Sequence, residues 1–444
     1  MYVLLNFLRK VIPRPVFDLY HRALSWLAAM WYGHPSRRLI VIGVTGTSGK
    51  TTTAYLVAKA LEASGAKTGC TTTAFFKVAD RTWSNATKMT MVGRFQLQHL
   101  LREMADAGCR YAVVETTSQG IMQHRHEHIA YDACVFTNLW PEHIEAHGGF
   151  ENYKRAKIRL FEYAAFLPPK VLDGQTVPRV EVLNASSKYA NDFVIRKFNK
   201  VAWYGIGNRE RGTGNRTLVA SDIMLSSDHV TFKVDGVSVA LRMPGMPNVE
   251  NALAALATAE ALGVSLRDAA RALGDVSSLP GRYERIDEGQ PWTVIVDFAF
   301  EPVAVTKLYE VVAADRHGRI IHVLGSTGGG RDVSRRPVLG RIAGEKASVV
   351  IVTNEDPYDD DPWEIINHVA DGAVQAGKQD GHDLYRILDR RDAIRLAMKM
   401  AKTGDVVLIT GKGSEPVMAV AGGRKIPWSD AEEARKAILE VTKR

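Results

Sequence analysis

The segment that most constrains the fold is the glycine-rich run GVTGTSGKTTT at residues 43–53, because of what flanks it. An apolar, β-branched stretch, RLIVIGV, leads into this run, and KTTTAYLVAKALEASG continues from it with helical periodicity. A glycine loop between a strand and a helix aims backbone N–H groups at phosphate. The usual P-loop spelling requires glycine at position 44, where this chain has Val44. The residues that phosphate binding needs are nevertheless present, namely Gly46, Gly49, Lys50 and Thr51.

Strands and helices alternate along most of the chain. The apolar runs YAVVETTS and ACVFTNL lie between two segments with helical periodicity. Towards the C-terminus the runs TVIVDFA, RIIHVLGS, ASVVIVTNEDP and DVVLITGKGSE each end in a polar or glycine-rich loop. This alternation predicts an α/β fold with two mainly parallel, doubly wound sheets, which bind ligands beyond the strand C-termini. Between residues 199 and 245 we expect short antiparallel strands, followed by a helix that starts at Asn248.

The composition is typical of a large cytoplasmic protein that does not bind nucleic acid. The chain has 444 residues, 46% of them hydrophobic, and its formal charge of +8 is modest for this length. Basic and aromatic residues do not cluster as they do on a nucleic-acid reading face. Cys70, Cys109 and Cys134 are scattered without metal-ligand spacing, which indicates a reducing compartment.

Residues 1–38 differ from the rest of the chain, since they mix aromatic, leucine and basic residues between prolines. Their least polar stretch has about ten residues, too few to cross a bilayer by the roughly twenty-residue rule. Five residues recur at helical spacing on one apolar face: Phe17, Tyr20, Leu24, Leu27 and Trp31. Two interpretations of this amphipathic segment remain open. It is either a helix docked on its own protein or a helix that lies at the inner face of a membrane as a peripheral contact.

Nine motifs in a fixed order make the sequence resemble a known family. They are GVTGTSGKTTT, VVETTSQG, TNLWPEHIEAHG with YKRAKIRLF, GMPNVENALAA, LPGRYERID, VDFAFEP, LGSTGGGRDVSRRP, NEDPYDDDP and GKGSE. This series closely resembles that of the Mur ligases, most like the MurE type, from about residue 39 to the C-terminus. The resemblance implies a central P-loop ATPase domain over residues 39–278 and a C-terminal Rossmann-like, amino-acid-binding domain over residues 279–444. MurE-type enzymes also carry an N-terminal UDP-binding domain, which we expect to be absent because only residues 1–38 precede the ATPase domain.

The resemblance implies an ATP- and Mg²⁺-dependent ligase that forms an amide bond. Such an enzyme activates an acceptor carboxylate as an acyl phosphate, which the amine of an amino acid then attacks. Because the γ-phosphate is held beside a carboxylate of the same charge sign, the site needs cations. Lys50 would contact the β- and γ-phosphates, Arg282 would reach them from the C-terminal domain, and Asp297 would take the ribose side. The implied nucleotide site comprises Gly46, Thr47, Gly49, Lys50, Thr51, Thr52, Asn138, Asn251, Arg282 and Asp297.

The resemblance also implies two Mg²⁺ ions. Thr51 and Glu115 would hold the first, since an unpaired carboxylate at the end of a buried strand would be costly. His143, or alternatively His147, would bind the second ion. Lys157 would join it as a carbamate formed with CO₂, which turns a cation into an anionic oxygen ligand. Without the resemblance, Lys157 is only one of several basic residues on a helix face.

The proposed substrate positions combine matches with departures from the family pattern. Positions that hold the incoming amino acid in MurE-type enzymes are matched by Arg331, Gly411 and Glu415. Acceptor-site candidates are Thr72, Thr73 and Thr87, the last of them in a stretch similar to the family's peptide-binding one, although its part KMTMVGR differs from the family pattern. In VDFAFEP, Phe298 and Phe300 replace the tyrosine and histidine of the family, so the nucleotide contacts there differ.

The run NEDPYDDDP is the most informative departure. Diaminopimelate-adding enzymes carry an arginine for the distal carboxylate where this chain has Tyr358. A second carboxylate would lose its charge-assisted partner, so the acidic Glu355, Asp356 and Asp359 favour a basic side chain such as that of lysine or ornithine. A solvated acidic turn is the alternative interpretation.

We therefore predict a ligase that joins an amino acid to the carboxylate of a peptide-like acceptor, in cell-wall peptide synthesis or a related pathway. Two other functions remain open. A glutamate ligase similar to folylpolyglutamate synthase fits the fold, although the C-terminal motifs are of the MurE type. A non-catalytic, membrane-associated nucleotide-binding scaffold fits the N-terminal helix and the altered VDFAFEP motif.

Overall fold

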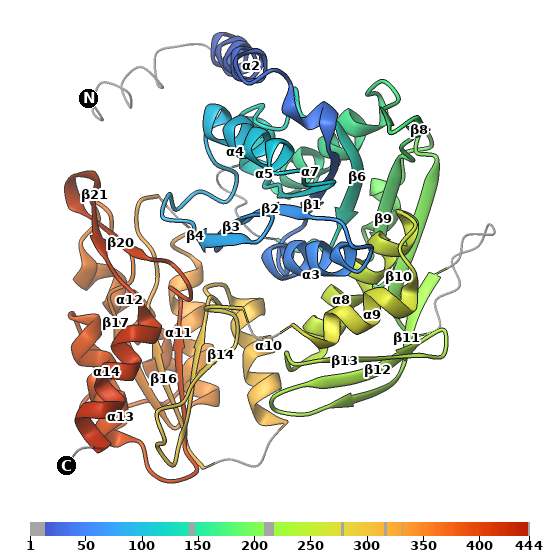
Figure 1. Ribbon diagram of the computed structural model, residues 1–444. Helices are drawn as coiled ribbons and strands as arrows, with labels where there is room; N and C mark the ends of the chain where they lie inside the picture. The colour runs from blue at the N-terminus through green and yellow to red at the C-terminus, as the bar shows by residue number, and fades with distance from the viewer. Residues whose placement is uncertain are drawn as a thin grey trace.

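The computed structural model describes residues 14–141, 147–207, 217–276, 279–314, 318–330 and 332–442. Within these ranges the chain forms two main β-sheets, one of eleven strands and one of six, with helices on both faces of each (Figure 1). Parallel pairs dominate both sheets. The predicted α/β fold with mainly parallel, doubly wound sheets is therefore confirmed.

The larger sheet contains the glycine-rich loop. Its strand order is β13-β12-β11-β10-β9-β6-β1-β5-β2-β3-β4. All pairs from β11 across to β2 are parallel, and antiparallel strands extend both edges. The strands are β1 Ile40–Thr45, β2 Thr68–Thr71, β3 Phe75–Val78, β4 Arg81–Ser84, β5 Tyr111–Glu115, β6 Tyr131–Phe136, β9 Val180–Asn184, β10 Lys200–Ile206, β11 Thr217–Leu225, β12 Val230–Val234 and β13 Val237–Leu241.

The prediction of antiparallel strands between residues 199 and 245 is correct for β11 to β13 and wrong for β10. Strand β10 pairs in parallel with both β9 and β11. An alternating apolar pattern shows which face of a strand is buried but not which way the neighbouring strand runs. The direction of β10 follows from its place beside the parallel strands, which local sequence does not encode.

Alternate residues of β1 pack into two separate cores. Ile40, Ile42 and Val44 belong to the core under α3 Lys50–Glu62, α8 Met246–Ala261 and α9 Leu266–Gly274. Val41 belongs to the opposite core, with α4 Arg94–Asp106 and α7 Phe150–Ala165, while the short helix α5 Ser118–Met122 lies beside α7. A buried aliphatic side chain contributes about 1.5–3 kcal/mol, so both cores fix β1 and the loop that follows it.

The smaller sheet has the order β14-β15-β19-β16-β17-β18. Its strands are β14 Glu284–Ile286, β15 Thr293–Asp297, β16 Ile320–Leu324, β17 Val349–Thr353, β18 Leu384–Ile387 and β19 Val406–Thr410. One face packs on α10 Pro302–Ala313, α11 Arg335–Lys346 and α12 Pro362–Gln375, and the other on α13 Arg390–Met400 and α14 Asp430–Thr442. The hairpin of β20 Val417–Val420 and β21 Arg424–Pro427 follows β19. Loops at the carboxyl ends of β17 and β19 contact the larger sheet's half of the molecule, since Asp356 and Glu415 pair with Lys88.

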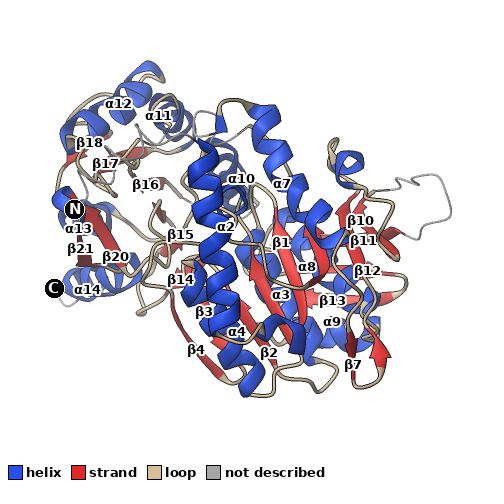
Figure 2. Cartoon of the chain, turned by 90° about the horizontal axis from the view of Figure 1, so that it is seen from above, coloured by secondary structure: helices blue, strands red, loops and turns tan. Residues whose placement is uncertain are grey.

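The N-terminal helix α2, Arg14–Trp31, lies on the outside of the molecule against α4 (Figure 2). It docks through small residues, since Ser25, Ala28 and Ala29 are buried. The predicted apolar face is not the docking face, because Leu27 and Trp31 are 45% and 78% exposed. Small residues allow the close approach of two helices, which periodicity of large apolar residues does not reveal. No helix in the described part of the chain is long and apolar enough to span a bilayer.

Candidate nucleotide and amino-acid site

The glycine-rich loop connects β1 to α3 and leaves no room for side chains at two positions. Gly46 has φ 152°, and a Cβ atom there would lie 1.9 Å from Thr137 Oγ1. Gly49 has φ 76°, and its Cβ would lie 2.5 Å from Asn251 Oδ1. Both positions therefore require glycine. The resulting close approach of backbone to its surroundings is the kind of cradle that a phosphate-binding loop needs.

Residues from other elements hold this loop in place. The Ser48 N–H donates to Asn138 Oδ1 at 2.9 Å, and the Thr47 N–H donates to the Asn138 carbonyl at 2.9 Å. Asn251 Oδ1 accepts a hydrogen bond from Thr53 Oγ1 at 3.0 Å. The Lys50 ammonium folds back over the loop to the Thr47 carbonyl, at 2.8 Å. Asn138 and Asn251 thus shape the loop on which nucleotide would bind.

Glu115 lies at the end of β5 next to the first turn of α3. It is 2% exposed, and its Oε2 accepts from Thr51 Oγ1 at 2.9 Å and from the Thr73 N–H at 2.8 Å. Arg282, from the C-terminal half, reaches the same Thr51 hydroxyl at 3.5 Å. A carboxylate and a hydroxyl that converge at the start of a phosphate-binding helix form an oxygen donor set of the kind that Mg²⁺ prefers. The donor chemistry therefore fits one Mg²⁺ beside bound phosphates.

Lys157 of α7 is buried under the glycine loop. Its ammonium donates to the Gly46 carbonyl at 2.7 Å and lies 4.4 Å from the centre of the Tyr153 ring. The Tyr153 hydroxyl lies 3.1 Å from Thr47 Oγ1. His147 Nε2 lies 3.1 Å from Ser118 Oγ, and His143 is outside the described residues. Among the described residues, no group of three His, Cys, Asp or Glu side chains converges as a metal site.

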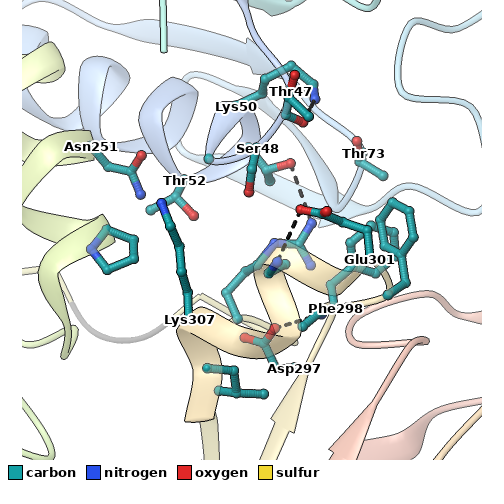
Figure 3. Close-up of a pocket in the computed structure, with 18 of the residues that line it drawn as sticks. Thr47, Ser48, Lys50, Thr52, Thr73, Asn251, Asp297, Phe298, Glu301 and Lys307 are labelled. Atoms are coloured by element: carbon teal, nitrogen blue, oxygen red, sulfur yellow. Dashed lines mark hydrogen bonds between the residues drawn. The ribbon is translucent and has the colours of Figure 1, made fainter. Parts of the chain in front are cut away.

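Arg282 and Asp297 line the same pocket as the glycine loop (Figure 3). Asp297 accepts from the backbone N–H groups of Tyr283 and Ala299, at 2.6 and 2.7 Å, and burial raises its pKa. The Arg282 guanidinium lies 4.3 Å from the centre of the Phe298 ring. Burial lowers the pKa of Arg282, while Asp297 and Glu115 oppose that shift.

The two phenylalanines that depart from the family pattern form an aromatic pair. Phe298 and Phe300 lie 5.1 Å apart edge to face, and the Arg335 guanidinium lies 5.3 Å from the centre of the Phe300 ring. Both line the pocket. Each ring thus offers an apolar surface with an arginine guanidinium near it, at a position where the family pattern places a hydrogen-bonding side chain.

The predicted amino-acid residues gather at the carboxyl ends of β17 and β19. A Cβ atom on Gly411, whose φ is 106°, would lie 2.2 Å from Glu355 Oε2. Glu355 is buried, which raises its pKa to about 7. Asp356 and Glu415 are both paired with the buried Lys412. Arg331 lies outside the described residues.

The other substrate candidates are less uniform in position. Tyr358 has φ 55° and packs its ring against Gly329, while Asp359 accepts the Gly422 N–H at 2.8 Å. Thr73 lines the pocket, and its hydroxyl contacts Glu115 Oε1 at 3.1 Å. Thr72 uses its hydroxyl within the turn before β3, and Thr87 uses its own on Asn85. Of the three threonines, only Thr73 faces the pocket.

Several residues that line the pocket were not anticipated from the sequence, and three of them carry polar groups of interest. Tyr153, Lys307 and Lys88 all line the pocket. Lys307 lies over the Trp140 ring at 5.1 Å, and Lys88 pairs with residues of the C-terminal half. Tyr153 begins the quoted YKRAKIRLF motif, so its position was available as a signal. The two lysines carried no local signal, because their partners are distant in sequence.

Comparisons with known proteins agree with this architecture. The model of the Mur ligase middle domain matches residues 44–259, and that of the Mur ligase glutamate ligase domain matches residues 281–413. A UDP-N-acetylmuramyl-tripeptide synthetase from Roseiflexus sp. (strain RS-1) is 41% identical over 94% of this chain and 82% of its own length. This chain belongs to the Mur ligase family. The Mur ligase uses ATP and Mg²⁺ to form an amide bond, as the resemblance implied.

Further relatives place this Mur ligase among its neighbours. A UDP-N-acetylmuramoyl-L-alanyl-D-glutamate–2,6-diaminopimelate ligase from Geobacillus kaustophilus (strain HTA426) is 35% identical over 94% of this chain and 83% of its own. A solved structure with the same enzyme name is 28% identical, with TM-score 0.59 over 91% of this chain and 79% of that one. Folylpolyglutamate synthase from Mycobacterium tuberculosis has TM-score 0.65 at 17% identity, over 88% and 92% of the two chains, which shows a shared fold.

Proposed function

We propose that this Mur ligase joins an amino acid to the carboxylate of a nucleotide-sugar-linked peptide acceptor in cell-wall peptide synthesis. The observation that carries the proposal is the shared pocket, in which Arg282 from one half reaches Thr51 of the other. The same pocket contains the glycine loop and Glu415, one of the residues that we propose to hold the amino acid. The names of relatives that are 35–41% identical support the acceptor class. The glutamate ligase function has no comparable support, since the folylpolyglutamate synthase likeness concerns the fold.

Each half has its own part in this proposal. We assign residues 39–278 to ATP binding and residues 279–444 to the amino acid, with a cytoplasmic location where such acceptors are made. ATP supplies the phosphoryl group that activates the acceptor carboxylate. Lys50 and Arg282 are positioned to hold the phosphates and to offset the charge that develops between them and that carboxylate. Thr51 and Glu115 would hold Mg²⁺, while Thr47, Thr52, Asn138, Asn251 and Asp297 would position the nucleotide.

We further propose that Lys157 is carbamylated and serves a second Mg²⁺ together with His143. Its burial and its position against the glycine loop support this role. Intact mass spectrometry at neutral pH after bicarbonate treatment should show one added CO₂ on the wild type and none on Lys157→Met. Phosphate release by the wild type should fall when CO₂ is removed and recover with bicarbonate. The carbamate is contradicted if phosphate release does not depend on bicarbonate and the wild-type protein shows no added mass.

The central experiment is a matrix of phosphate-release assays. UDP-linked and unlinked muramyl peptides are crossed with the twenty amino acids, diaminopimelate and ornithine. Release should require both an acceptor and an amino acid, and Lys50→Met should abolish it. Release with ATP alone in every combination contradicts the ligase proposal. If Lys50→Met leaves the protein's cellular function intact, the non-catalytic scaffold is the better description.

We also propose a peripheral contact between α2 and an anionic membrane surface. Leu19, Trp26 and Met30 share one stripe of α2 and are 68%, 47% and 49% exposed, with the exposed Arg22 beside them. Replacing all three apolar residues with serine should reduce sedimentation with phosphatidylglycerol vesicles. Met224→Ser is the control, because Met224 is 66% exposed on β11, away from α2. Equal sedimentation of both variants and the wild type would contradict the proposed membrane contact.

A further inference from the structure

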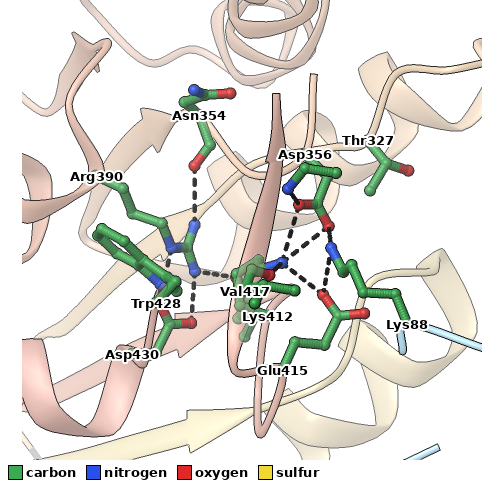
Figure 4. Close-up of polar contacts among 12 residues, drawn as sticks. Lys88, Thr327, Asn354, Asp356, Arg390, Lys412, Glu415, Val417, Trp428 and Asp430 are labelled. Atoms are coloured by element: carbon green, nitrogen blue, oxygen red, sulfur yellow. Dashed lines mark hydrogen bonds and ion pairs between the residues drawn. The ribbon is translucent and has the colours of Figure 1, made fainter. Parts of the chain in front are cut away.

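Lys88 crosses from the larger sheet's half of the molecule into the amino-acid pocket. Its ammonium forms an ion pair with Asp356, and it lies 3.1 Å from Glu415 Oε2 (Figure 4). Only 6% of its side-chain surface is exposed. Lys88 and Glu415 both line the pocket that contains the glycine loop. A cation from one half is therefore built into the side of the pocket that the other half provides.

The cluster around Lys88 is balanced in charge. Asp356 and Glu415 supply two negative charges, and Lys412 supplies one positive charge through contacts of 2.9 Å and 2.5 Å with them. Lys88 supplies the second positive charge. Without it, the buried Asp356 and the partly buried Glu415 would share a single cation, which leaves one of them without a full partner.

The loop that carries Lys88 is held in a strained conformation. Lys88 has φ 59°, a left-handed value that costs a non-glycine residue roughly 1 kcal/mol or more. Asn85 fixes the preceding turn, because its Oδ1 accepts from the N–H and the hydroxyl of Thr87 at 3.0 and 2.6 Å. The Asn85 amide in turn donates to the Met89 carbonyl at 3.0 Å. These contacts on both sides hold the backbone in the conformation that aims Lys88 at Asp356.

We propose that Lys88 is a specificity-determining residue. It selects the amino acid by the charge at the end of the amino acid's side chain. This inference rests on the proposed function, since it concerns the same site. With Lys88 in place, Glu415 is already paired twice, so a side-chain ammonium has to compete with Lys88 for it. A ligand side chain that carries a carboxylate or no charge meets no such competition. Lys88 thus disfavours ω-ammonium side chains and favours the others.

The test compares Lys88→Met with the wild type, because methionine keeps much of the length and removes the charge. The amino acids are L-ornithine and L-lysine, which carry an ω-ammonium, L-α-aminoadipate, which carries an ω-carboxylate, and L-norleucine, which carries neither. The ratio of kcat/KM for ornithine to that for α-aminoadipate should rise at least about tenfold in the variant. Lys88→Arg retains the charge and should restore the wild-type preference.

Lys425→Met is the matched control. Lys425 Nζ donates to the Thr87 carbonyl at 3.1 Å, so it bridges the same loop to the C-terminal half without contacting Asp356 or Glu415. This variant should leave the ratio unchanged. If Lys88→Met instead lowers kcat/KM by the same factor for every amino acid, Lys88 is only a clamp between the halves and the proposal is overturned.

A second measurement separates this proposal from the ligase assignment. Calorimetry measures the binding of ornithine and α-aminoadipate to the full-length wild type and to Lys88→Met without any turnover. Should the wild type release no phosphate with any acceptor, the proposed function fails, and the binding ratio alone decides the role of Lys88. A ratio that differs less than about threefold between the two proteins refutes that role.

Discussion

Glu115→Gln separates a metal-binding role of Glu115 from a structural one. Glu115 Oε2 accepts hydrogen bonds from the Thr51 hydroxyl and the Thr73 N–H, and its Oε1 lies 3.1 Å from the Thr73 hydroxyl. A glutamine carbonyl in the Oε2 position still accepts the hydrogen bonds from the Thr51 hydroxyl and the Thr73 N–H. Its amide group donates to the Thr73 hydroxyl, whose own proton already goes to Thr90 at 2.8 Å. The substitution therefore keeps both hydrogen bonds at Oε2 and removes the charge.

The two roles predict different magnitudes. The loss of charge assistance weakens two hydrogen bonds by roughly 1 kcal/mol each, and removal of a buried anion offsets most of this loss. We expect the free energy of unfolding to change by about 1 kcal/mol or less. Loss of an anionic ligand is expected to cost Mg²⁺ binding about 1.5–3 kcal/mol, which is a rise of about 10- to 140-fold in the KM for Mg²⁺.

Phosphate release at varied Mg²⁺ and urea unfolding of the same preparations measure the two quantities. Glu62→Gln is the control, since Glu62 ends the same helix α3 and pairs with Lys59 and Lys77, both at 3.0 Å. It should reduce the free energy of unfolding by about 1 kcal/mol and leave the KM for Mg²⁺ unchanged. The metal-binding role is refuted if Glu115→Gln lowers the free energy of unfolding by more than about 2 kcal/mol while the KM for Mg²⁺ stays at its wild-type value.

Three further substitutions test the glycine loop and the buried carboxyl group. Gly49→Ala and Gly65→Ala both place alanine at a left-handed φ, 76° and 77°; Gly65→Ala should cost about 1 kcal/mol of stability, and Gly49→Ala more, because its Cβ would lie 2.5 Å from Asn251 Oδ1. Only Gly49→Ala pushes on Asn251, so only that variant should raise the KM for ATP, by about tenfold or more. Burial raises the pKa of Glu355 from 4.5 to about 7, so its stabilising effect is complete below about pH 4.5 and is lost as the pH rises to about 7. Over this interval the unfolding free energy of the wild type should fall by roughly 3 kcal/mol relative to Glu355→Gln, and parallel pH profiles of the two proteins would contradict the raised pKa.

The parts of the molecule that the sequence predicted are those in which neighbouring residues carry the information. The glycine loop could be located because strand, loop and helix follow one another between Ile40 and Glu62. The direction of β10 could not be predicted, because it depends on which strands lie beside it. The docking face of α2 could not be predicted for a related reason, since small residues such as Ala28 and Ala29 make the contact with the rest of the protein.

Lys88 shows the same limit at the candidate site. It contacts Asp356, which lies 268 residues further along the chain. Nothing in the local run NATKMT indicates that this lysine, rather than another basic residue, enters a buried acidic cluster. A family motif also gave no help, because the stretch KMTMVGR departs from the family pattern at this point.

The acidic run NEDPYDDDP has two different parts, one near the surface and one that points into the protein. Asp359 and Asp360 accept backbone N–H groups of Gly422 and Gly329 near the surface, so they stabilise loops. Glu355 and Asp356 point inward, but the raised pKa of Glu355 reduces its charge and two lysines neutralise Asp356. The acidic composition of the run is therefore not available to bind a basic side chain. A preference for lysine or ornithine requires Lys88 to leave Glu415, whereas a fixed Lys88 selects a side chain without an ω-ammonium. The amino-acid preference of the wild type and of Lys88→Met consequently decides between these two states of one pocket.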